Sequence, residues 1–71
     1  MGMYNYKVIF AGKMVFFCAV TTAKAPPDHA GHVYYRTDEE KKRLTYAIIK
    51  AETEADAVSE AEKLIKEYYM L

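Results

Sequence analysis

The sequence predicts an α+β fold, a four-stranded antiparallel meander made of two hairpins and followed by one C-terminal helix that packs on one sheet face. Two pairs of strand-like segments precede a stretch whose apolar residues recur at helical spacing. A run of loop-forming residues with two prolines separates the pairs. The 71 residues are expected to form a single small domain, residues 1–71, with one long loop at 22–31.

The first hairpin is predicted from the alternation in residues 4–10 and the glycine that follows. One face carries Tyr4, Tyr6, Val8 and Phe10, and the other carries Asn5, Lys7 and Ile9. Ala11-Gly12 supplies a turn, since Gly tolerates positive φ, and residues 13–21 form the second strand. A two-residue turn would place Phe10 opposite Lys13 and set Val15, Phe17 and Ala19 on the face of Val8. The other face would carry Met14, Phe16, Cys18 and Val20, so this strand is apolar on both sides and both sides need a cover.

The second hairpin follows a segment without periodicity. Residues 22–31 contain two consecutive prolines, which exclude a helix and a central strand. Residues 32–36 recover strand character, the charged residues 37–42 form a connection, and residues 43–51 form a second strand. We therefore expect the segments 32–36 and 43–51 to pair.

The C-terminal helix is predicted from its cap and its apolar stripe. Thr53 has Asp56 three residues later, which is the spacing of a capping box. The stripe consists of Ala57, Val58, Ala61, Leu64, Ile65 and Tyr68. Since one helix covers only one face of a sheet, the other face is expected to stay open and to pack against a copy of itself.

Size and charge limit the classes of protein. Lys plus Arg and Asp plus Glu each number 10, so no strong field attracts nucleic acid or an anionic membrane. The longest apolar run, Met14 to Val20, has seven residues, against about 20 for a membrane-spanning helix. Ala23-Lys24-Ala25 resembles a signal-peptide cleavage site, but too few residues would follow it to fold unaided. The lone Cys18 forms no intramolecular disulfide and fits a reducing compartment, so we expect a cytoplasmic protein.

The sequence offers little for catalysis or for a cofactor. Asp28, His29 and His32 are residue types that bind Zn²⁺, but no second ligand pair accompanies them, and we interpret them as part of a solvated loop. Whether His29 and His32 bind a metal stays open. Cys18 lies in the most apolar strand, where burial makes a thiol inert. We expect no enzyme activity, no catalytic residue, no metal and no cofactor.

The seven tyrosines leave two interpretations of the open sheet face. The first is a small non-enzymatic interaction or assembly domain, a homodimer through that face or a binder of another protein. The alternative is a single-stranded nucleic-acid-binding domain that stacks bases on tyrosines and neutralises phosphates with Lys and Arg. Zero net charge favours the first. The candidate face residues are Tyr4, Tyr6, Phe16, Tyr34, Tyr35, Arg36, Arg43 and Tyr46.

The order of the predicted elements, strands first and a helix last, resembles a single repeat of the PUR-type single-strand nucleic-acid binders. The resemblance is one of topology and includes no diagnostic residues. It therefore implies a sheet-and-helix repeat and assigns no binding residues.

Overall fold

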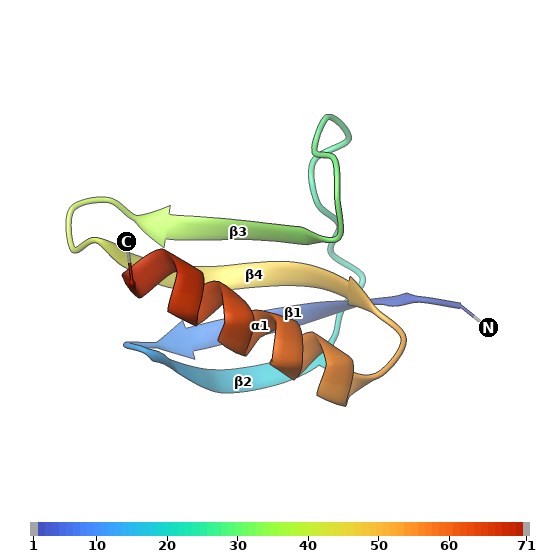
Figure 1. The fold of residues 1–71 in the computed structure, drawn as a ribbon. Coiled ribbons are helices and arrows are strands. Elements are labelled where there is room, and N and C mark those ends of the chain that lie inside the picture. The colour runs from blue at the N-terminus through green and yellow to red at the C-terminus, as the bar shows by residue number, and fades with distance from the viewer. Residues whose placement is uncertain (1, 71) are drawn as a thin grey trace.

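The computed structural model describes residues 2–70 and contains one antiparallel sheet backed by one helix (Figure 1). The strands are β1 (Tyr4–Ala11), β2 (Met14–Val20), β3 (Val33–Asp38) and β4 (Arg43–Ala51), and the helix is α1 (Glu54–Tyr69). The predicted α+β class, its two hairpins and its C-terminal helix are confirmed. No helix within residues 2–70 has the length and apolar character needed to cross a membrane.

The strand order is β2-β1-β4-β3, which corrects one detail of the prediction. A meander would place β2 beside β3, whereas the two hairpins are joined here through β1 and β4. Tyr6 pairs with Ile49 and Val8 with Ala47, and all four side chains are buried. The strands with the most deeply buried residues therefore lie at the centre, and β2 becomes an edge strand.

The hydrophobic core lies between the sheet and α1. Ala57 and Ala61 are fully buried, and their small side chains let the helix approach the strands closely. The hydroxyl of Thr53 accepts a hydrogen bond from the Asp56 N–H at 3.1 Å, which confirms the predicted cap. The core consists of Tyr6, Val8, Phe10, Leu44, Ala47, Ile49, Ala51, Ala57, Ala61 and Ile65.

A β-bulge in β2 changes which residues face the helix. Phe10 lies opposite Val15 and Ile9 lies opposite Phe17, so Phe16 has no partner on β1. Because the bulge inserts one residue, every position after it changes face. Phe17 and Ala19 therefore leave the helix side, where we expected them, while Cys18 and Val20 move to it. Of the three residues predicted on the helix side, Val15 alone stays there, and it packs against the core.

The turn of this hairpin is also shifted by one residue. Ala11 lies opposite Met14, so the two turn residues are Gly12 and Lys13. Gly12 has a φ of +61°, a conformation that glycine adopts without steric cost. The expected pairing of Phe10 with Lys13 is therefore wrong.

The long loop between β2 and β3 crosses the sheet on the side opposite α1, behind the strands in Figure 1. His29 Nε2 donates a hydrogen bond to the Val33 carbonyl at 2.9 Å, and the Lys50 N–H donates one to the His32 carbonyl at 2.8 Å. Gly31 permits the path with a φ of +101°. Ile48 points away from the helix yet is only 5% exposed. The loop therefore covers part of the sheet face that α1 leaves free.

Candidate interaction face

The sheet surface opposite α1 is here called the open face. Cross-strand pairing arranges its side chains in two rows that run across all four strands. The first row consists of Phe17, Ile9, Tyr46 and Arg36. The second consists of Ala19, Lys7, Ile48 and Tyr34. These rows are apolar at the β2 end and carry most of their polar groups toward β4 and β3.

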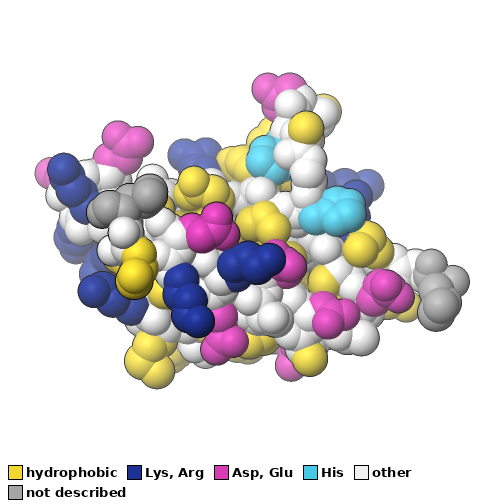
Figure 2. Space-filling view, in the orientation of Figure 1, with side chains coloured by type: hydrophobic (Ala, Val, Ile, Leu, Met, Phe, Trp, Pro, Cys, Tyr) yellow, Lys and Arg dark blue, Asp and Glu magenta, His cyan; other side chains and the backbone are white. Residues whose placement is uncertain are grey.

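The β2 end of the open face is rich in exposed apolar side chains. Phe16 is 73% exposed and Phe17 52% exposed, because the bulge places both outside the core. Met14 is 70% exposed at the start of the same strand. We call Ile9, Met14, Phe16 and Phe17 the apolar patch. In Figure 2, which shows the helix side, hydrophobic side chains also emerge along the lower margin, where β2 forms the sheet edge.

The other end of the open face combines aromatic rings with positive charges. Lys7 Nζ lies 5.1 Å from the centroid of the Tyr46 ring, within the range of a cation–π interaction. Arg36 Nη1 donates a hydrogen bond to the Tyr34 hydroxyl at 3.4 Å, and this bond raises the pKa of the guanidinium. No row position carries a carboxylate.

Acidic and basic side chains are distributed differently on the helix side. Figure 2 shows them intermixed over α1. Most carboxylates belong to α1 and the residues just before it, three more occur at the end of β3 and in the turn that follows, and Asp28 lies in the loop between β2 and β3. The positive charges of the open face are therefore not neutralised within its rows.

The candidate residues from the sequence separate into three groups. Tyr34, Arg36 and Tyr46 lie together on the open face. Phe16 is exposed in the bulge, and Arg43 is exposed at the start of β4 opposite Asp38. On the helix side lie Tyr4, Tyr6 and Tyr35, the last with its ring 6.4 Å from that of Tyr68.

Tyr6 is the clearest correction among these residues. Its side chain is 5% exposed within the core, and burial raises the pKa of its hydroxyl. It therefore belongs to no accessible face. Sequence reasoning omitted Ile9 and Phe17 from the candidates and counted Lys7 only among the Lys and Arg side chains of the nucleic-acid alternative. The alternation in residues 4–10 had already separated Lys7 and Ile9 from Tyr6, whereas Phe17 depended on the bulge.

His29 and Cys18, which were considered for metal binding or catalysis, make contacts that support the fold. The His29 ring packs edge to face against Tyr34 at 5.2 Å while its Nε2 holds the Val33 carbonyl, so His29 fastens the loop to β3. No group of three His, Cys, Asp or Glu side chains in the described part of the chain is arranged to hold a metal. Cys18 packs against the core, and burial raises the pKa of its thiol.

The fold and this face define a class of protein: a small α+β domain with a helix-backed antiparallel sheet whose second face is partly covered by a loop. Comparison of the chain with models of protein families, with curated proteins and with solved structures found no match. The function is therefore argued from the open face itself.

Proposed function

We propose that this chain is a small non-enzymatic assembly domain that forms a symmetric homodimer through the apolar patch of its open face. The observation that carries the proposal is the exposure of Phe16 and Phe17 side by side on an edge strand. Burial of apolar surface contributes about 25 cal/mol per Å². A contiguous group of large apolar side chains therefore favours association.

A second copy fits this surface because the patch is self-complementary. A two-fold axis near Phe17 brings apolar side chains of both copies together. Lys7 lies on β1 with its Nζ over Tyr46 of β4, and Arg36 lies on β3, so both positive charges are directed away from β2 in such a dimer. A chain of this size buries only about 60% of its unfolded surface, and a partner supplies further burial.

The bulge favours association through side chains over extension of the sheet. Bulges on edge strands disrupt the regular ladder that another strand would need. The unpaired Phe16 interrupts β2 near its middle. We therefore propose contact between the apolar patches, with the backbone of β2 unpaired at its outer edge.

Sedimentation equilibrium at micromolar concentrations tests the dimer. We expect the unaltered chain to be dimeric, and Phe16→Ser and Phe17→Ser to shift it to the monomer. Tyr35→Ser is the matched control, since Tyr35 is 43% exposed but faces the helix side. Circular dichroism checks that each variant stays folded. A monomeric unaltered chain, or equal effects of Tyr35→Ser and Phe17→Ser, contradicts the proposal.

The same surface supports a second candidate function, the binding of single-stranded nucleic acid. The specific observation is the pairing of cations with rings, Lys7 over Tyr46 and Arg36 beside Tyr34, without a carboxylate in the rows. Aromatic rings stack with bases and cations neutralise phosphates. Fluorescence anisotropy with a labelled oligonucleotide should then give salt-dependent binding that Tyr46→Ala weakens. A flat titration at low salt eliminates this candidate.

We also propose a cytoplasmic location. The support is chemical: Cys18 is the only cysteine and packs against the core as a reduced thiol. Reducing compartments keep such thiols free. Fluorescence microscopy of a tagged full chain in its own cell type tests the location, and a signal confined to the cell exterior contradicts it.

A further inference from the structure

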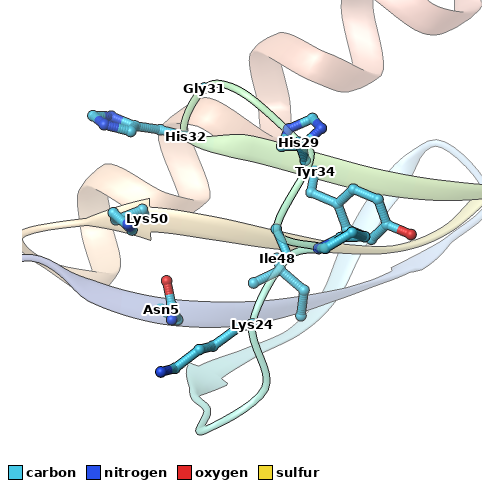
Figure 3. A pocket seen from close by; sticks show the side chains of 10 residues that line it. Asn5, Lys24, His29, Gly31, His32, Tyr34, Ile48 and Lys50 are labelled. Carbon is cyan, nitrogen blue, oxygen red and sulfur yellow. The ribbon is translucent and has the colours of Figure 1, made fainter.

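A second feature of the sheet surface is a cavity of about 290 Å³ beneath the long loop, here called the loop pocket (Figure 3). Its residues come from three parts of the chain. Asn5 and Lys50 come from the paired strands β1 and β4, Lys24 and His32 from the loop, and Tyr34 and Ile48 from the floor of the sheet. In Figure 3 the side chains of Asn5, Lys24 and Lys50 lie on one side of the pocket, and Tyr34 and His29 on the other.

The walls of the loop pocket are held in place without a ligand. Asn5 lies directly opposite Lys50 in the β1–β4 register. The Lys50 N–H donates to the His32 carbonyl at 2.8 Å, and His29 is bonded to the Val33 carbonyl at 2.9 Å. These bonds connect both the loop and its end to the strands. The cavity is therefore largely formed before anything enters it, as binding sites commonly are.

The charge of the loop pocket is unbalanced. Two lysines and two histidines line it, and no carboxylate does. The one ion pair recorded within residues 2–70, Lys63 with Glu60, lies on α1. Neither Lys24 nor Lys50 is paired with a carboxylate, so their two ammonium groups make the electrostatic potential in the loop pocket positive. An anion placed between them would relieve their repulsion.

The donor types favour a phosphoryl group among anions. No arginine lines the pocket, whereas planar carboxylates are most often recognised by the guanidinium fork. Lysine binds phosphate as a mobile point charge, and the Asn5 amide and an imidazole N–H can donate to the remaining oxygens. Tyr34 and Ile48 provide an apolar floor beside these donors, and the volume accommodates more than the phosphate itself.

We propose that the loop pocket binds the phosphoryl group of a nucleotide. The ammonium groups of Lys24 and Lys50 contact its oxygens, and the body of the nucleotide lies against the half-buried Tyr34 ring. The same chemistry has two sources, a free mononucleotide or the terminal phosphate of a strand. The site does not require the homodimer, because none of its residues belongs to the apolar patch.

Isothermal titration of the full chain with adenosine monophosphate tests the site, with adenosine as the ligand that lacks only the phosphate. We expect saturable binding of the monophosphate and a loss of about tenfold in affinity for Lys24→Gln and for Lys50→Gln. Lys41→Gln is the matched control, since Lys41 is exposed in the β3–β4 turn away from the pocket. Equal binding of adenosine, absence of binding, or equal losses in all three variants overturns the proposal.

Oligonucleotides with and without a 5′-phosphate distinguish the two sources. If the strand is the source, the phosphorylated oligonucleotide binds more tightly than adenosine monophosphate, and Lys50→Gln removes the difference. If the free nucleotide is the source, the monophosphate binds more tightly than either oligonucleotide. Amide NMR shifts at Lys24, Gly31 and Lys50 locate the ligand in either case. Shifts confined to β2 place the ligand elsewhere and contradict the site.

Discussion

The hydroxyl of Tyr69 donates a hydrogen bond to the carbonyl oxygen of Gly12 at 3.2 Å, which joins the end of α1 to the turn between β1 and β2. The same hydroxyl accepts a hydrogen bond from the Leu44 N–H at 3.0 Å, near the start of β4. One side chain therefore ties the helix end to both hairpins. Lys13 belongs to the same turn, and its Nζ lies 5.6 Å from the centroid of the Tyr69 ring.

Tyr69→Phe should lower the free energy of unfolding by about 1–2 kcal/mol, because it leaves the Leu44 N–H without its partner. Urea unfolding measures the change. Tyr68→Phe is the matched control, since no hydrogen bond of the Tyr68 hydroxyl is found among the described residues. Equal stability of the two variants would show that the Tyr69 hydroxyl contributes nothing to joining the hairpins.

Thr53→Ala should lower the free energy of unfolding by about 1 kcal/mol. The Thr53 hydroxyl accepts from the Asp56 N–H, one of the helix donors that have no partner within α1. Ser59→Ala is the control, since Ser59 is exposed on the same helix. Thermal unfolding followed by circular dichroism compares the two. If Ser59→Ala lowers the free energy of unfolding as much as Thr53→Ala does, the loss comes from replacing a hydroxyl residue by alanine in general, and the cap is not its cause.

Local sequence patterns predict the start of the helix and its packed face correctly. Thr53 with Asp56 indicated the helix start, and the apolar stripe indicated the face that packs. Alternation in residues 4–10 separated the two faces of β1, although Tyr4 and Tyr6 from the helix side were still counted among the open-face candidates. The pairing of β1 with β4 could not be read in this way, because it joins segments far apart in the chain and depends on which strands pack best at the centre.

The bulge escaped prediction for a physical reason. Residues 14–20 are apolar at every position, so the pattern contains no alternation that fixes which residue faces the core. For that reason Phe17 and Cys18 were assigned to the wrong faces. Tyr34, Arg36 and Tyr46 were named as candidates from the sequence and lie together. The loop pocket was not foreseen, since the path of residues 22–32 over Ile48 is a tertiary contact.

Lys42→Gly should raise the free energy of unfolding by about 0.5–1 kcal/mol. Lys42 has a φ of +53°, a left-handed conformation that costs a residue with a Cβ about 1–2 kcal/mol, and glycine removes most of this cost. Lys41→Gly, one residue earlier in the same exposed turn, should be neutral or destabilising. Urea unfolding ranks the two variants. Stabilisation by Lys41→Gly and not by Lys42→Gly would contradict the strain at Lys42.

Cys18 should react with iodoacetamide more slowly in the folded chain than in the unfolded chain at the same pH. Burial is the larger cause of its raised pKa, and the negative charge of Glu54 is the smaller. Because the folded state holds the thiol proton more tightly than the unfolded state does, the protonated thiol contributes to the stability of the fold. This contribution is complete below the unfolded pKa and is lost as the pH rises through the folded pKa. Alkylation rates measured against pH, with and without denaturant, give both midpoints.

Glu54→Gln should lower the folded midpoint of Cys18 only in part, since burial remains, and Glu62→Gln serves as the control on the same helix. A folded midpoint at or below the unfolded one would mean that β2 leaves the thiol open to water, and the helix-side position of Cys18 would then be wrong.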